Sequence, residues 1–150
     1  PGLMLSEGVG NEVEDVAGFF ATKRKLSLGD KSCAIGRLSW EWLEQSTKLE
    51  AVQRVGYVTK PTVTAVAEDV ALGAVEAGIV WHAVAASYPE LRFFPLSGEE
   101  VPLVMASVAV IGGRQRMNDA EKFARYLTES EEAKLVFEKY GFKRKGGASE

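Results

Sequence analysis

Hydrophobic and polar positions along this chain switch repeatedly between a strand-like and a helix-like pattern, with glycine, proline, aspartate and asparagine at the junctions. Short apolar or alternating runs predict strands at 3–6, 25–28, 55–58, 77–83, 91–96 and 101–111. Apolar residues three or four positions apart predict helices at 13–23, from Ser32 onward, at 62–73, at 118–128 and at 131–140. The pattern therefore predicts an α/β fold in which strands and helices alternate.

Short connections between these elements indicate βαβ units, which build a mainly parallel sheet with helices on both faces. The pair Gly112-Gly113 breaks the chain before two terminal helices, of which the second has Ser130 as its N-cap and Gly141 after its end. In sheets of this kind, ligands bind beyond the carboxyl ends of the strands, at the N-termini of the helices.

The segment 61–83, PTVTAVAEDVALGAVEAGIVWHA, joins a helix start to a short apolar strand that ends on an aromatic ring. Thr62 and Val63 begin the helix, Gly73 ends it, and Trp81 closes the strand. A helix start exposes unpaired backbone N–H groups and the positive end of the helix dipole, which together attract anions. An indole N–H seeks a hydrogen-bond partner when it is buried, so Trp81 reaches either a ligand oxygen or a backbone carbonyl.

A second helix start follows a strand at Ser32-Cys33-Ala34-Ile35, and it resembles Pro61-Thr62-Val63-Thr64 in its small and hydroxyl residues. Neither four-residue start contains a lysine or an arginine, which suits a site that holds an anion by neutral hydrogen bonds. Ordinary helix capping without a ligand explains the same residues equally well.

Composition limits the function further. The 150 residues are 46% hydrophobic and 26% charged with a net charge of -3, so the chain is globular and offers no broad basic field for nucleic acid. The basic cluster at 143–145 is interpreted as part of a solvated tail. Cys33 stands alone, which rules out an internal disulfide, and no apolar run reaches the length of a membrane span. The sequence begins without a signal peptide, which indicates either a cytoplasmic protein or a mature or excised piece.

The sequence gives only weak support for covalent catalysis or for a metal site. Cys33 and His82 are the single residues of their types and form a conceivable nucleophile–base pair, but nothing around them matches a nucleophile signature. The adjacent acids Glu68 and Asp69 diverge on a helix, and no metal-ligand spacing is present. The glycines of segment 8–11, GVGN, predict an ordinary turn, because the segment lacks the third glycine of a dinucleotide fingerprint and the lysine of a P-loop. No cofactor and no metal are expected.

Several motifs together resemble the molybdate- and tungstate-binding proteins of bacterial ABC transporters, which are type II periplasmic solute-binding proteins. The resemblance covers most of residues 8–142. The motifs that carry it are LGD at 28–30, CAIGR at 33–37, TVxxVAxxV at 62–70, GAVEAGIVW at 73–81, AxxFxxYL at 120–127, SxEA at 130–133 and FxxYGF at 137–142.

The resemblance implies an α/β lobe of a type II periplasmic-binding-protein-like fold that grips a tetrahedral oxyanion without bond chemistry. It implies ligand contacts at Val63 and Trp81, with a second amide near Ala34 or Ile35. With the hydroxyl of Thr62 and the amide of Thr64, these residues form the predicted binding set. Relatives carry an acidic residue after the aromatic position, where this chain has the sequence HAV at 82–84, so the identity of the anion stays open.

The resemblance also implies an architecture and partners. We expect a ligand-binding lobe at 1–112, a helical pair at 113–142 and a flexible tail at 143–150. The family's first lobe, with two anion-binding serines, has no counterpart here, so the site is expected to need that lobe or a second chain. The C-terminal helices would then expose apolar side chains such as Phe123, Phe137 and Tyr140. The expected partners are a small oxyanion and an ABC transporter permease, in the periplasm or another extracytoplasmic compartment.

Two other functions stay open from the sequence. The same fold serves as the ligand-sensing domain of cytoplasmic transcriptional regulators, and a DNA-binding module encoded upstream would favour that function. An enzyme that uses Cys33 and His82 is the second alternative, and it requires the two side chains to lie within hydrogen-bond reach.

Overall fold

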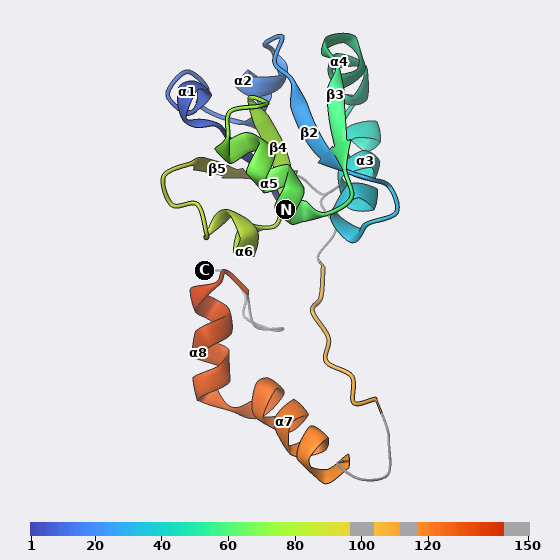
Figure 1. Ribbon diagram of the computed structural model, residues 1–150, viewed down its shortest axis with the longest axis vertical. Helices are drawn as coiled ribbons and strands as arrows, with labels where there is room; N and C mark the ends of the chain where they lie inside the picture. The colour runs from blue at the N-terminus through green and yellow to red at the C-terminus, as the bar shows by residue number, and fades with distance from the viewer. Residues whose placement is uncertain (97–103, 112–116, 143–150) are drawn as a thin grey trace. The chain divides into compact units, whose positions relative to one another are not determined.

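The computed structural model describes residues 1–96, 104–111 and 117–142 (Figure 1). The chain forms two compact units, Pro1–Pro102 and Leu103–Glu150, and each is described by itself. The division predicted from the sequence, at 112 and 142, stays a prediction. Residues 101–103, the Gly112-Gly113 pair and the basic tail at 143–150 lie outside the described residues.

The first unit is built on a sheet whose strand order is β3-β2-β4-β1-β5, with five strands among the described residues (Figure 1). The strands are β1 (Gly2–Leu5), β2 (Leu26–Gly29), β3 (Tyr57–Lys60), β4 (Ala77–Val80) and β5 (Arg92–Pro95). Strand β2 pairs in parallel with β3 and β4, whereas β1 lies antiparallel between β4 and β5. The sheet is therefore mixed and not mainly parallel as predicted, because the strand that opens the chain runs against both of its neighbours.

Helices cover both faces of this sheet. In the first unit they are α1 (Glu7–Gly10), α2 (Val16–Phe20), α3 (Ala34–Gln45), α4 (Leu49–Val55), α5 (Val63–Ala71) and α6 (His82–Ala85). Alternate residues of β1 pack into cores on opposite faces of the sheet. Leu3 and Leu5 pack into the core that contains α3, while Met4 packs into the core that contains α5. The predicted α/β class with helices on both faces is confirmed.

Several predicted boundaries differ from the observed ones. The helix predicted at 13–23 is reduced to α2, because the Asp15 carboxylate accepts the Gly18 amide at 2.6 Å and so starts the helix late. The 8–11 turn is a single helical turn, α1. Helix α4 was not predicted, and it takes up Val55, so the next strand begins two residues later than expected. The strand predicted at 77–83 ends at Val80.

Two further predictions are wrong. Ser32 does not cap α3; the N-cap is Cys33, and its side chain makes no capping hydrogen bond. The strand predicted at 101–111 is absent over 104–111, where every residue is exposed, and its first three positions are not described. The β-branched residues there find no neighbouring strand within the described part of the second unit, and an isolated strand leaves its backbone groups without ladder partners.

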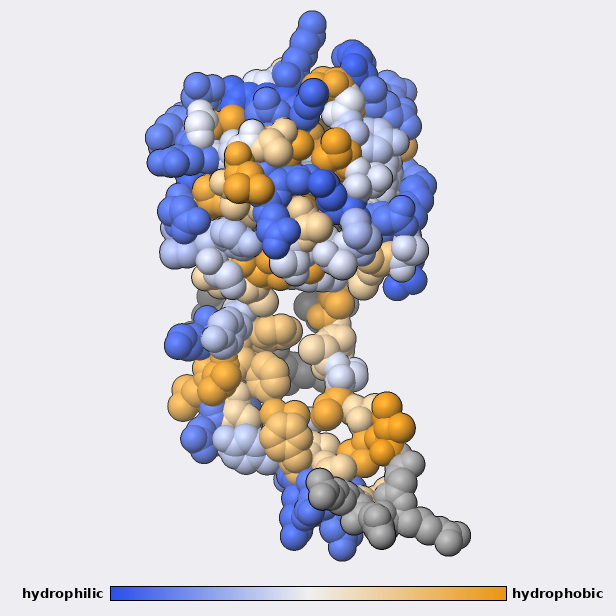
Figure 2. Space-filling model, viewed as in Figure 1, coloured by the Kyte–Doolittle hydropathy of each residue, from blue (hydrophilic) through white to orange (hydrophobic). Residues whose placement is uncertain are grey.

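The second unit contains the two predicted terminal helices, α7 (Met117–Glu129) and α8 (Glu131–Lys139). Ser130 caps α8 by accepting the Ala133 amide at 3.4 Å, and Gly141 follows with a φ of +80°, as predicted. Most apolar side chains of this unit are exposed, as Figure 2 shows by its orange surface over these helices and over 104–111. Phe123, Phe137 and Tyr140, which were predicted to be exposed or to find another partner, lie at the surface of the helical pair.

Gly36 offers a test of how closely α3 packs on the sheet. A Cβ at this position would lie 1.9 Å from the backbone oxygen of Asp30 and 2.5 Å from that of Gly29, where neither group can move aside easily. We expect Gly36→Ala to lower the free energy of unfolding by about 3 kcal/mol, measured by urea denaturation. Gly8→Ala is the matched control, because nothing lies within 4 Å of its Cβ position, and it should change stability by less than about 1 kcal/mol. Equal midpoints for Gly36→Ala and the wild type would contradict the close approach.

Candidate functional site

The predicted binding residues come together at one edge of the sheet. Strands β2, β3 and β4 run in the same direction, so the segments that follow them all leave from the same edge. These segments lead to the starts of α3, α5 and α6 respectively (Figure 1). Ala34 and Ile35 therefore share an edge with Thr62, Val63, Thr64 and Trp81, as expected for a binding site at the carboxyl ends of strands.

The start of α5 presents free backbone donors. Thr62 is the N-cap, and its hydroxyl oxygen accepts the Ala65 amide at 3.2 Å. Among the described residues, the amides of Val63 and Thr64 have no hydrogen-bond partner, and Thr62 and Thr64 are exposed. This start can therefore donate two amides, and the hydroxyl proton of Thr62, to an acceptor in solution.

The start of α3 is packed tightly against the strand before it. A Cβ at Gly29 would lie 2.8 Å from the Cys33 sulfur and 2.8 Å from the Gly36 nitrogen, so glycine is required for this approach. The amides of Ala34 and Ile35 have no recorded acceptor within the described segments, while the Ile35 side chain is buried in the core. The helix start is rigid and its first donors are free.

Trp81 lies between strand and helix. It is the N-cap of α6, and its backbone oxygen accepts the amides of Val84 and Ala85 at 3.0 Å each. The ring is partly buried against the core that contains α3. Its indole N–H has no hydrogen-bond partner in the described part of the chain. The backbone carbonyl that the sequence analysis offered as a possible acceptor is therefore not observed there.

A lysine borders the shared edge, outside the four residues of each helix start. Lys60 ends β3, two residues before the α5 cap, and its ammonium lies 2.9 Å from a carboxylate oxygen of Asp69. The second oxygen of Asp69 accepts the hydroxyl of Ser27, which is fully buried, at 3.0 Å. Lys60 directly precedes Pro61, so its position in the sequence already indicates a cation beside the α5 start.

Asp30 adds a negative charge to the same edge. Its side chain is exposed and accepts the Ser32 amide at 2.9 Å. Hydrogen bonds from Ser32, chiefly from its hydroxyl and then from its amide, hold the pKa of the Asp30 carboxyl below its ordinary value. The Asp30 amide donates to the Lys60 backbone oxygen at 2.7 Å, which joins the loop before α3 to the loop before α5.

Cys33 and His82 do not form the pair that an enzyme would need. No hydrogen bond joins them within the described segments; Cys33 packs against the core, and the exposed His82 ring lies 5.3 Å from the ring of Phe93. Nor do the described residues contain a group of three or more His, Cys, Asp or Glu side chains placed to hold a metal ion. The helices of the described segments are all too short or too polar to span a membrane.

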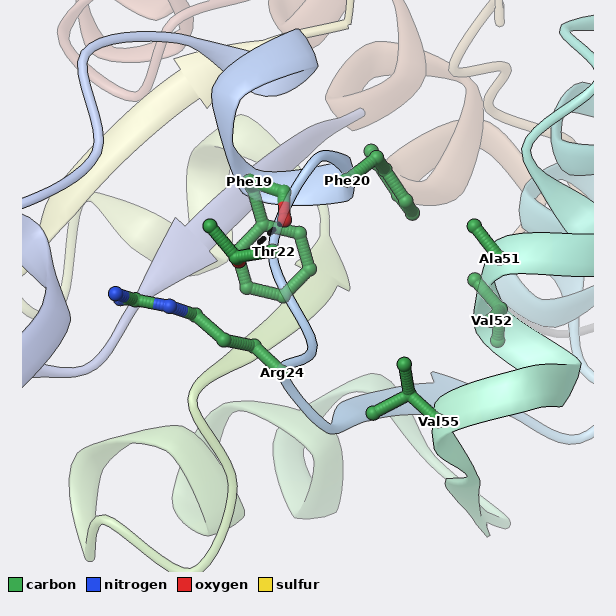
Figure 3. A pocket seen from close by; sticks show the side chains of 7 residues that line it. All are labelled: Phe19, Phe20, Thr22, Arg24, Ala51, Val52 and Val55. Carbon is green, nitrogen blue, oxygen red and sulfur yellow. Dashed lines mark hydrogen bonds between the residues drawn. The ribbon is translucent and has the colours of Figure 1, made fainter.

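Two hollows of the first unit lie away from this edge. One, between α2 and α4, has a volume of about 10 Å³, the space of a single water molecule, with mainly apolar walls such as Phe19, Val52 and Val55 (Figure 3). The other, of about 590 Å³, is an open depression between the segments 6–12 and 70–76. Both flank the amino ends of the parallel strands, so neither coincides with the shared edge of helix starts.

Comparison with known proteins identifies the class. The family model described as "Bacterial extracellular solute-binding protein" matches residues 1–143, and the chain therefore belongs to this family. The fold is similar to that in a crystal structure of PEB3 bound to L-phospholactate, with a TM-score of 0.62 and 14% sequence identity. The alignment covers 96% of this chain but 64% of the PEB3 chain, so this chain spans less than two thirds of that protein's length. No curated protein matches this sequence significantly.

The Asp30–Ser32 contact predicts a pH effect. Because the folded-state pKa of Asp30 is lowered, the contact stabilises the fold above the ordinary carboxyl pKa, and this contribution disappears as the pH falls through the lowered value. We expect Ser32→Ala to raise the pKa of Asp30 in an NMR titration of its side-chain carbonyl carbon. The stabilities of wild type and variant should converge at acidic pH, and an unchanged Asp30 pKa in the variant would contradict the assignment.

Proposed function

We propose that this chain is the second lobe of a bacterial extracellular solute-binding protein that captures a small oxyanion, of the molybdate or tungstate type, and delivers it to an ABC transporter permease. The binding residues in this proposal are Ala34, Ile35, Thr62, Val63, Thr64 and Trp81. They act as hydrogen-bond donors, and no bond in the solute is made or broken.

The observation that carries the proposal is the convergence of two helix starts with free amides at one edge of the sheet. Four amides, of Ala34, Ile35, Val63 and Thr64, have no acceptor recorded in the described part of the chain. Free donors at helix starts bind anions without needing a full counter-charge, because the partial positive charge of each helix end supports them. Membership of a solute-binding family supports a binding function over catalysis. The anionic ligand named for PEB3, a phosphate ester with a carboxylate, agrees in charge with this proposal.

We further propose that the site is completed by the family's first lobe, or by a second chain. In our proposal these donors form one wall of a cleft and do not enclose a ligand alone; the two hollows described above lie at the opposite edge of the sheet. The part of the PEB3 chain without a counterpart here is large enough to supply an opposite wall. The exposed apolar face of α7 and α8 supports the same interpretation, because a pair of helices with so little buried surface needs a further packing partner.

Ligand binding is the direct test. Isothermal titration calorimetry of the full-length protein with molybdate, tungstate, sulfate, phosphate and L-phospholactate should show saturable binding of at least one of these anions. Binding should compete with an excess of the tightest anion and raise the melting temperature, since a ligand that binds only the folded state stabilises it. Absence of binding for all five would sink the oxyanion proposal.

Trp81→Phe tests the indole as a ligand donor. The substitution keeps an aromatic ring but removes the N–H, and loss of a hydrogen bond to a charged group costs about 1.5–3 kcal/mol, so the anion should bind at least about tenfold more weakly. Trp42→Phe is the control, because the buried indole N–H of Trp42 has no partner in the described residues and Trp42 lies far along α3 from its start. Equal losses of affinity in the two variants would assign the effect to packing.

A further inference from the structure

The charges around the shared edge do not favour an anion when they are counted together. The exposed Asp30 carboxylate carries a full negative charge close to the start of α3. Lys31, its neighbour, is engaged elsewhere: its ammonium lies 3.8 Å from Glu44 and 5.0 Å from the centre of the Trp40 ring. The free amides of the helix starts attract an anion, and a further positive charge at this edge would strengthen the binding of a dianion against the repulsion of Asp30.

The backbone of Lys60 lies at the shared edge, and its ammonium is turned toward Asp69. Its backbone oxygen accepts the Asp30 amide at 2.7 Å, and its chain continues through Pro61 to the α5 cap. The Lys60 backbone is thus fixed at the junction of the two helix starts. Its side chain is 34% exposed, so solvent and a bound solute can reach it. A lysine ammonium on a flexible four-carbon stem can also change partners without movement of the backbone.

Asp69 binds the Lys60 ammonium, but the position of the Asp69 side chain does not depend on that contact alone. The carboxylate lies six residues beyond Val63 in α5, about 9 Å along the helix axis. One of its oxygens contacts Lys60 at 2.9 Å, while the other accepts the hydroxyl of buried Ser27 at 3.0 Å. If Lys60 turns away, Asp69 keeps one hydrogen bond and its place. The three groups connect β2, β3 and α5 through the Asp69 carboxylate.

We propose that Lys60 is the charge-neutralising residue for the bound anion, and that Asp69 is a positioning residue that retains the Lys60 ammonium while the site is empty. This inference rests on the proposed function and adds to it a selection for doubly charged anions. The solute and the Asp69 carboxylate compete for one ammonium, so the affinity for a dianion reflects the difference between the two attractions.

Competition predicts opposite effects for the two partners. In calorimetric titrations of the full-length protein with molybdate, Lys60→Gln should weaken binding by about tenfold, because the counter-charge is lost. Asp69→Asn should strengthen binding by about three- to tenfold, because the ammonium no longer has a competing carboxylate. Lys60→Arg keeps the charge and should stay within about threefold of the wild type. Sulfate and L-phospholactate serve as second probes, in case molybdate is not the preferred anion.

Charge selectivity gives a measurement that a purely structural role would not change. Lys60→Gln should reduce the affinity for the doubly charged probes far more than that for nitrate, which carries one charge. Lys23→Gln is the matched control: it removes the same charge from an exposed position before β2, at the other edge of the sheet. It should leave both affinities unchanged. Circular dichroism melts of each variant establish that it is folded at the titration temperature.

The possible outcomes separate the two proposals. Opposite shifts for the Lys60 and Asp69 variants, with the loss concentrated on dianions, support the inference. If the wild type binds an anion but Lys60→Gln binds it equally well, or if both variants weaken binding alike, the role of Lys60 is refuted and the proposed function stands. A wild-type protein that binds none of the anions overturns both.

Discussion

The first unit depends on the close approach of α3 to the end of β2. Gly29 and Gly36 have no side chains, and the helix backbone therefore packs directly against the strand backbone. The loop between them is then fixed to β3 by the 2.7 Å hydrogen bond from the Asp30 amide to the Lys60 oxygen. Since α5 begins just after Lys60, this one contact sets the distance between the two helix starts. The geometry of the candidate site is therefore set mainly by backbone packing and backbone hydrogen bonds, and only to a small extent by side chains.

The sequence predicted which helices and strands form better than it predicted where each of them begins and ends. Segments with a clear period, such as α5 with Val66 and Val70 on one side, were recognised because their apolar residues also form the observed core. The late start of α2 depends on the Asp15 cap, and the missed α4 has one fully buried residue, Val52, so its apolar period was weak. The antiparallel direction of β1 has no local signature at all, because it follows from the order in which strands join the sheet.

The candidate site was also predicted only in part, because some of its features depend on consecutive residues and others on contacts between residues far apart in the chain. Helix starts and the strand that leads to Trp81 are properties of consecutive residues, so the sequence located them. The bond between Asp30 and Lys60, and the contacts of Asp69 with Lys60 and Ser27, join residues far apart in the chain and required a structure. The role of each predicted binding residue stays a prediction, because donors without a ligand define where an acceptor fits and not which acceptor it is.

Strand β3 gives the site a mechanical property. It is an edge strand that pairs only with β2 among the described residues, and Tyr57, Val58 and Thr59 are exposed. Edge strands with little buried surface open more readily than central ones, so their amides exchange with solvent faster. The α5 start is attached to this strand, whereas the α3 start is attached to the buried strand β2. One helix start of the candidate site is therefore attached to a central strand and the other to an edge strand. A solute that connects them would be detected as slower amide exchange along β3, well beyond the atoms it touches.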